Sequence, residues 1–126
     1  MKHIPHESLR VIAQEIVSAA GSIGDEPRLV ADNLVYANLT GHDSHGIGML
    51  AAYMDSVLNG ELVPNQHAEI VEDNAAVVVV DGNAGYGQVI GFEAMKIGIE
   101  RAREHGVCVL ALRGSYHLCR IGAWGE

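Results

Sequence analysis

Apolar residues recur every three or four positions along the first sixty residues, in three separate segments. This spacing predicts amphipathic helices over residues 5–20, 25–41 and 46–59. Glycine follows the first and third segments, at Gly21 and Gly60, where left-handed helix caps are common. The residues expected to face the core are Leu9, Ile12, Ala13, Ile16 and Ala20 in the first helix, Val30, Ala31, Leu34 and Ala37 in the second, and Met49, Leu50, Tyr53 and Val57 in the third.

After the third helix, β-branched runs replace the helical spacing. A short strand is expected at 68–71, followed by a polar turn at 72–75. The continuous valine run at 77–80 predicts a strand that is buried on both faces. A long helix over 88–105 and a second buried strand over 107–112 follow. The residues of the long helix expected to point inward are Val89, Phe92, Met95, Ile99 and Ala102.

A strand, a long helix and a second strand form a βαβ unit, whose strands are parallel and whose crossover is right-handed. The predicted fold class is therefore α/β, with an N-terminal helical region, residues 1–62, followed by the start of a mixed or parallel sheet, residues 63–126. So few strands do not complete a covered parallel sheet, and residues 121–126 resemble the beginning of another helix. We therefore expect an incomplete domain, the N-terminal part of a longer α/β protein.

Composition narrows the possible functions. Of the 126 residues, 48% are hydrophobic and 19% are charged, which is typical of a globular protein. The net charge of −8 disfavours nucleic acid and anionic membrane surfaces as partners. The N-terminus has no apolar signal region, and two cysteines, Cys108 and Cys119, are too few for a disulfide framework. We expect a cytoplasmic protein with reduced thiols.

A glycine-rich segment, residues 82–87, connects the valine strand to the long helix. A dinucleotide-binding fingerprint occupies such a place, but Ile90 stands where its third glycine belongs, and no acidic residue ends the next strand. The preferred interpretation is a tight turn whose glycines adopt positive φ. A phosphate-binding loop of the Gly-Lys type is absent, because the sequence contains no Gly-Lys pair.

Two polar clusters are candidate functional sites, and the first is residues 42–46, His-Asp-Ser-His-Gly, between the second and third predicted helices. Asp43 or Ser44 could cap the third helix. The same position would present a hydroxyl and an imidazole to an anionic substrate. Zinc binding by His42 and His45 is a weaker alternative, because no third and fourth ligand is nearby.

The second cluster, residues 113–122, directly follows the last predicted strand. Loops at the carboxyl ends of parallel strands often carry the chemistry of α/β proteins. His117 is a candidate general acid and base, because the ordinary pKa of histidine lies near neutrality. A solvated loop histidine is the alternative. A cysteine hydrolase, with Cys119 as nucleophile and His117 as base, has no other support in the sequence.

Together these motifs resemble the malate/L-lactate dehydrogenase family, which also includes sulfolactate and ureidoglycolate dehydrogenases and is distinct from the Rossmann-fold lactate dehydrogenases. The matching segments are residues 31–34 (ADNL), 41–49 (GHDSHGIGM), Tyr53, 81–88 (DGNAGYGQ), 115–117 (SYH) and 120–122 (RIG). The similarity covers nearly the whole chain and is closest to the hydroxycarboxylate dehydrogenase B-like branch. Members are much longer than this chain, so the resemblance implies an N-terminal fragment of a non-Rossmann α/β enzyme that is usually a homodimer.

The resemblance also implies an activity: the transfer of a hydride between NAD or NADP and a small 2-hydroxy acid by an oxidoreductase. In the reverse direction the substrate is the 2-oxo acid. The reaction needs no metal. The implied site residues are His117 as catalytic acid and base, Ser44 and His45 at the substrate, and His45, Cys119, Arg120 and Ile121 at the cofactor.

Two positions depart from the family pattern. Met49 stands where many members have an arginine that can hold the substrate carboxylate, which leaves the carboxylate partner open. Cys119 stands where glycine is usual, which can crowd the cofactor or change the loop. Because most of the cofactor site would lie beyond residue 126, we expect the isolated chain to be inactive. The alternative function is a non-catalytic α/β interaction or assembly module.

Overall fold

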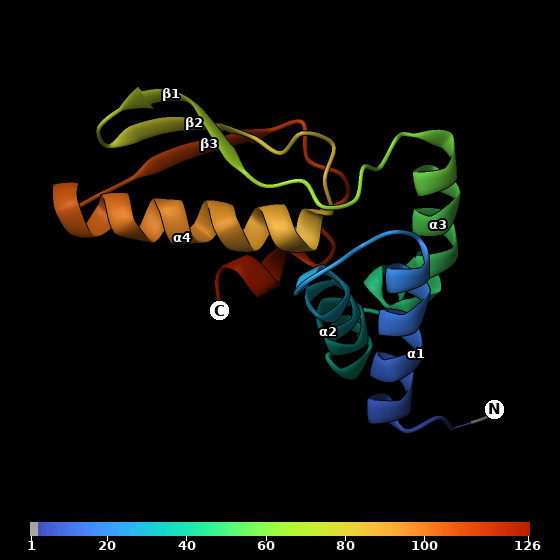
Figure 1. The fold of residues 1–126 in the computed structure, drawn as a ribbon. Coiled ribbons are helices and arrows are strands. Elements are labelled where there is room, and N and C mark those ends of the chain that lie inside the picture. Colours follow the sequence, from blue (N-terminus) through green and yellow to red (C-terminus); the bar gives the residue numbers. More distant parts are fainter. Residues whose placement is uncertain (1–2) are drawn as a thin grey trace.

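The computed structural model describes residues 3–126, in which helices come first and a small sheet follows (Figure 1). The elements, in chain order, are α1 (His6–Ala19), α2 (Glu26–Leu39), two single 3-10 turns (Asp43–His45 and Ile47–Met49), α3 (Leu50–Asn59), β1 (Glu69–Asn74), β2 (Val77–Asp81), α4 (Gly87–His105), β3 (Val109–Arg113) and a last 3-10 turn (Ile121–Trp124). The predicted order of helices and strands is confirmed.

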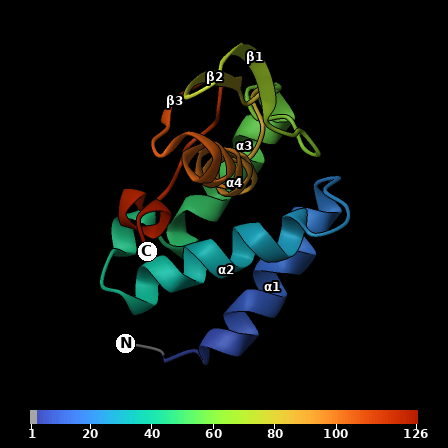
Figure 2. The same ribbon diagram turned by 90° about the vertical axis from the view of Figure 1, so that its left-hand side faces the viewer.

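The three strands form one sheet in the order β1, β2, β3. β1 is antiparallel to β2, and β2 is parallel to β3 with Val77 opposite Val109. The β2–α4–β3 connection is therefore the βαβ unit that the sequence predicts. α4 lies along one face of the sheet, and α1, α2 and α3 gather beyond one end of it (Figure 1). Figure 2, which looks along α4, shows this helix between the sheet and α2.

The first strand is longer than predicted. Asp73 and Asn74 pair with Val78 and Val77, so the strand continues through the segment expected to be a turn. The reversal begins only at the last residue of the predicted turn, Ala75, which adopts a left-handed φ of 58°.

The prediction that the strands are buried on both faces is wrong for this chain. Val78 and Val80 are fully buried, whereas Val77 is 48% exposed and Val109 is 60% exposed. Side chains alternate between the two faces of a strand, so one face is covered and the other is open. Within residues 3–126, α4 covers one face of the sheet and no element covers the other (Figure 1).

One hydrophobic core joins the N-terminal helices to the loops at the end of the sheet. Its buried members are Ala13, Val17, Val30, Ala31, Leu34, Ala37, Leu50, Tyr53, Leu62, Tyr86, Val89 and Cys119. Residues from both sides of the predicted boundary at 62/63 therefore pack together. The division into two regions stays a prediction.

The buried face of α2 is as predicted, and those of α1 and α4 agree only in part, at Ala13 and Val89. All four predicted residues of α2 are buried. In α1 the buried residues are Ala13 and Val17, because α2 packs on the side next to the expected one, and Ile12 and Ile16 are exposed. In α4 burial is confined to the first half, residues 87–94, which lies near both the sheet and α2. The exposed residues expected to be inward in α4 are Phe92, Met95 and Ile99. Among the described residues, no helix is both long and apolar enough to cross a membrane.

Candidate active site

The loops that follow β2 and β3 are held together by backbone hydrogen bonds. The Ala84 N–H donates to the Gly114 carbonyl over 2.6 Å, and the Tyr116 N–H donates to the Gly85 carbonyl over 3.0 Å. This pairing places His117 beside the first turn of α4, at the carboxyl ends of β2 and β3. α/β proteins commonly bind ligands at this edge of the sheet.

The glycines of the turn before α4 serve close packing, and not the positive φ that the sequence predicts. The left-handed residues of the turn are Asn83, with φ of 50°, and Ala84, with φ of 58°. A Cβ atom on Gly87 would lie 2.8 Å from Leu118 Cα and closer still to the carbonyl of His117. Gly87 therefore allows the His117 loop to pack directly on the start of α4.

The two predicted polar clusters meet within one chain. The imidazole rings of His45 and His117 stack with their centroids 5.6 Å apart and an angle of 25° between their planes. Ser44 Oγ is hydrogen-bonded to His45 Nδ1 over 2.9 Å. In the described part of the chain, no group of three or more His, Cys, Asp and Glu side chains is arranged to hold a metal ion.

His117 is held from below by a buried tyrosine. The hydroxyl of Tyr53, on α3, lies 2.9 Å from His117 Nδ1, and Gln88 Nε2, on α4, donates to the same hydroxyl over 2.8 Å. Tyr53 is fully buried and Gln88 is 1% exposed. Burial raises the pKa of Tyr53 far above its usual value, so the hydroxyl keeps its proton. Within residues 3–126, the His117 ring is hydrogen-bonded through Nδ1 and not through Nε2.

Two effects lower the pKa of His117. Burial penalises the charged imidazolium, and the neighbouring His45 ring adds a smaller electrostatic effect in the same direction. The neutral imidazole is therefore favoured in the folded chain, and it can accept a proton at one ring nitrogen and donate at the other.

The cluster at 42–46 does not cap α3 as predicted. Asp43 and Ser44 lie in a 3-10 turn, and neither side chain makes a capping hydrogen bond to the helix. The amide of Asn38 instead holds the segment before α3: its oxygen accepts the Ile47 N–H over 2.8 Å, and its nitrogen donates to Asp43 over 2.6 Å. Ser44 bonds His45.

Cys119 supports the site from beneath. It adopts a left-handed φ of 61°, which explains why glycine would suit this position. Its thiol donates to the His45 carbonyl over 2.8 Å, and the residue is 2% exposed. Burial raises the pKa of the Cys119 thiol, and hydrogen bonds from the Arg120 backbone and from Gln88 oppose this rise. A covered thiol is poorly placed to touch a cofactor through its side chain.

Arg120 and Ile121, the other residues expected at the cofactor, differ in accessibility. The Arg120 guanidinium is paired with Glu126 over 2.7 Å and lies 5.2 Å from the centroid of the Tyr36 ring. Ile121 is 65% exposed. In this chain Arg120 is thus already engaged, and Ile121 presents apolar surface.

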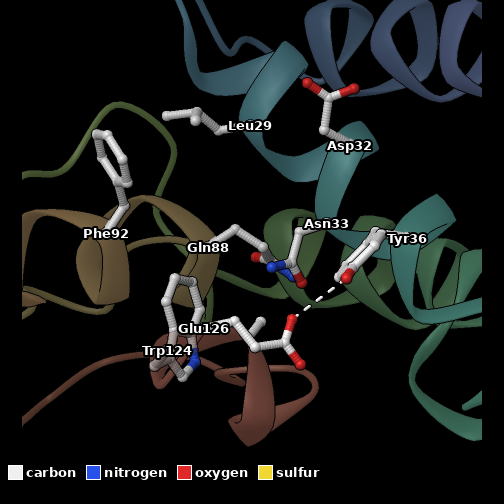
Figure 3. Close-up of a pocket in the computed structure, with 9 residues that line it drawn as sticks. Leu29, Asp32, Asn33, Tyr36, Gln88, Phe92, Trp124 and Glu126 are labelled. Atoms are coloured by element: carbon white, nitrogen blue, oxygen red, sulfur yellow. Dashed lines mark hydrogen bonds between the residues drawn. The ribbon is translucent and has the colours of Figure 1, made fainter. Parts of the chain in front are cut away.

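An open pocket of about 270 Å³ lies beyond Gln88, between α2, α4 and the last 3-10 turn (Figure 3). Its lining consists of Leu29, Asp32, Asn33, Tyr36, Gln88, Phe92, Ala123, Trp124 and Glu126. Gln88 reaches from α4 toward Asn33 in this view, and the side-chain oxygens of both amides are buried without a hydrogen-bond partner among residues 3–126. The amide nitrogen of Gln88 thus bonds Tyr53, and its oxygen remains unpaired beside this pocket.

No role in the site was predicted for Tyr53 or Gln88. The sequence indicated Tyr53 as an inward residue of the third helix, and both residues lie in segments that match the family. A buried tyrosine hydroxyl needs a polar partner, so an inward Tyr53 already indicated that a polar side chain would lie next to it. Which histidine supplies the partner depends on how α3 and the loop after β3 pack.

A mixed α/β chain with a histidine supported in this way at the carboxyl ends of its parallel strands has the features of an enzyme. The model of the malate/L-lactate dehydrogenase family matches residues 4–126. The chain therefore belongs to this family, whose members are 2-hydroxy acid dehydrogenases.

Individual relatives agree with this assignment. Hydroxycarboxylate dehydrogenase B of Escherichia coli O157:H7 is 47% identical over 120 residues, which is 95% of this chain and 33% of the relative. Malate dehydrogenase of Pyrococcus abyssi is 35% identical over 114 residues, 90% of this chain and 32% of the relative. A solved E. coli structure described as a malate/lactate dehydrogenase superposes with a TM-score of 0.95 at 44% identity, covering 98% of this chain and 35% of that one. The chain thus spans about a third of the length of these relatives.

Proposed function

We propose that this chain carries the proton-transfer part of an oxidoreductase that moves a hydride between NAD or NADP and a small 2-hydroxy acid. The observation that carries the proposal is the half-buried His117, held at Nδ1 by the buried Tyr53 hydroxyl and stacked on His45. Relatives named malate, L-lactate and L-sulfolactate dehydrogenases support the substrate class, since all three compounds are small 2-hydroxy acids.

His117 acts through Nε2 in this proposal. In reduction of a 2-oxo acid, the imidazolium gives its Nε2 proton to the carbonyl oxygen as a hydride reaches C2. In oxidation the neutral imidazole takes the hydroxyl proton as the hydride leaves C2. A general acid and base works best with a pKa near the working pH, and a slightly depressed histidine pKa meets this condition. Tyr53 can accept from Nδ1 when that nitrogen is protonated and donate to it when it is not, so it can orient the ring in both states.

Ser44 and His45 are the groups that this chain offers to the substrate. They lie in the 3-10 turn before α3, and the His45 ring stacks on His117. Where Ser44 donates to His45 Nδ1, His45 can donate to a substrate oxygen through Nε2. Where His45 Nδ1–H donates to Ser44, the Ser44 hydroxyl can donate to the substrate instead. Met49, at the following turn, supplies no charge for the carboxylate.

The cofactor, when bound, supplies or accepts the hydride. The residues fit its nicotinamide end, because the stacked His45 and His117 rings offer aromatic contact and Ile121 offers exposed apolar contact. They do not form a complete dinucleotide site. Arg120 is occupied by Glu126, and β3 ends at Arg113, which pairs with Asp81, where an acidic ribose partner would stand in a Rossmann fold. We therefore propose that the 126-residue chain alone neither binds NAD(P)H tightly nor turns over substrate.

The alternative function, an interaction or assembly module, draws support from the uncovered apolar surface. Phe92, Met95 and Ile99 on α4 and Val77 and Val109 on the open face of the sheet are at least 40% exposed. Such a surface can also pack against further polypeptide in a catalytic whole enzyme, so it does not argue against catalysis. We propose that this whole enzyme is a homodimer in the cytoplasm.

A chimera separates the two functions. This chain replaces the matching third of E. coli hydroxycarboxylate dehydrogenase B, and oxidation of NADH and NADPH is followed with pyruvate, oxaloacetate and sulfopyruvate. Turnover of any of these 2-oxo acids supports the oxidoreductase. A folded chimera that binds the reduced cofactor and reduces none of them supports the non-catalytic alternative.

A further inference from the structure

A chain of hydrogen bonds begins at Gln88 and ends on His117. We propose that Gln88 is a positioning residue, which acts through Tyr53 to fix which ring nitrogen of His117 carries the proton. The inference rests on the proposed function for its catalytic meaning, since His117 is the acid and base there. The arrangement of the proton itself is a property of the protein without substrate or cofactor.

The first step is the direction of the Gln88 bond. The amide nitrogen of glutamine can only donate, so Nε2 gives a hydrogen to the Tyr53 oxygen over 2.8 Å. Gln88 and Tyr53 are both almost fully buried, so bulk water has little access to reverse the bond.

The second step is the direction of the Tyr53 bond. With its oxygen accepting from Gln88, the hydroxyl has one proton of its own to place. The remaining partner is His117 Nδ1, at 2.9 Å. Tyr53 therefore donates to Nδ1.

The third step is the state of His117. A neutral imidazole that accepts at Nδ1 carries its hydrogen on Nε2. Nε2–H can donate a hydrogen bond to the carbonyl oxygen of a 2-oxo acid. For Nε2 to take a proton in the oxidation direction, the ring hydrogen must instead be on Nδ1, with the Tyr53 hydroxyl turned to accept it. Protonation of the ring would bring an Nδ1–H against the Tyr53 O–H, so the hydroxyl would have to turn away. The arrangement thus also disfavours the imidazolium.

Few other titratable groups face His117. His45 stacks on it from the 3-10 turn before α3, and Tyr53 faces it from α3. In its own loop, Cys119 donates to the His45 carbonyl, and the Tyr116 hydroxyl is bonded to Ser56 instead. Of these groups, Tyr53 alone forms a hydrogen bond with the His117 ring.

Histidine-labelled samples of the 126-residue chain test the inference by NMR, because ¹H–¹⁵N correlations over two bonds identify the protonated ring nitrogen. Wild type is expected to carry the His117 proton on Nε2. Gln88→Met keeps the length of the side chain and donates nothing, so the Tyr53 hydroxyl can turn. We expect mixed tautomers and a His117 pKa that rises toward the ordinary value of about 6.5. Asn33→Leu is the matched control. It removes the other amide of the pocket, which does not bond Tyr53, and leaves tautomer and pKa unchanged.

Gln88→Glu provides a second variant with the opposite polarity. Once ionised, the introduced carboxylate accepts the Tyr53 proton, and the Tyr53 oxygen then accepts from Nδ1–H. We expect the His117 tautomer to reverse and its pKa to rise by about one unit or more. A merely structural role for Gln88 would lower stability without moving the tautomer.

Two results overturn the inference: a wild-type chain with the proton on Nδ1, or Gln88 variants whose tautomer and pKa match wild type. Neither depends on turnover. A failure of the proposed activity would therefore leave this result standing, and the reverse also holds.

Discussion

The contact between Gly87 and the His117 loop predicts that a single methyl group disturbs both the fold and the site. In Gly87→Ala, the added Cβ would start 2.8 Å from Leu118 Cα, and ordinary contact begins at 3.4 Å. Leu118 must therefore retreat by about 0.6 Å, and the His117 carbonyl, which is closer, by more. Extra groups in a packed interior cost about 1–3 kcal/mol. We expect a loss of this size in the free energy of unfolding.

Urea unfolding of the 126-residue chain, followed by circular dichroism, measures this loss. Gly98→Ala is the matched control on the same helix, because its Cβ would meet only Leu110 Cδ1, at 3.8 Å. There alanine should stabilise the chain by about 0.5–1 kcal/mol through helix propensity. In the chimeric enzyme, Gly87→Ala should lower turnover by about 10²-fold, since a displacement near 1 Å misplaces the acid. Equal stabilisation by both alanines would refute the packing argument.

Two further predictions concern stability. Cys119→Gly should be more stable than Cys119→Ala by about 1 kcal/mol, because both lose the thiol and only alanine keeps the strain of a left-handed φ. Urea unfolding of the two variants measures this difference in stability. A more stable alanine variant would contradict the prediction. Burial and His45 lower the pKa of His117, so the unfolded chain takes up its proton first as the pH falls. The contribution of neutral His117 to the free energy of unfolding is therefore complete above about pH 6.5 and is lost as the pH falls below it. The free energy of unfolding of His117→Gln should fall less than that of wild type between pH 7.5 and 5.5. An equal fall in both proteins would contradict the assignment.

The parts of the fold that local signals determine were predictable from the sequence. The stripe of α2, the left-handed glycines at Gly21 and Gly60 and the βαβ unit all follow from local patterns along the chain. The buried faces of α1 and α4 were not predictable in the same way. They depend on which neighbour each helix meets, and Phe92 shows that an apolar side chain at helical spacing need not be covered by this chain.

The candidate site shows the same distinction. His117, Ser44 and His45 were predictable as site residues from their motifs, and the structure brings them together. Their roles stay proposals. The support of His117 by Tyr53 and Gln88 joins α3, α4 and a loop, so no local pattern reveals it. The backbone of Cys119 is similar: its positive φ was signalled only by the family's preference for glycine there.

The central claim is that His117 transfers the proton in 2-oxo acid reduction. Its most direct test is the turnover number of the chimeric enzyme, measured as NAD(P)H oxidation for wild type, His117→Ala and the control His67→Ala. His67 is an exposed histidine bonded to Glu93, away from the site. His117→Ala should lower turnover by about 10²–10⁴-fold with little change in cofactor affinity, and His67→Ala should leave both near wild type. A His117→Ala enzyme with near wild-type turnover would contradict the account.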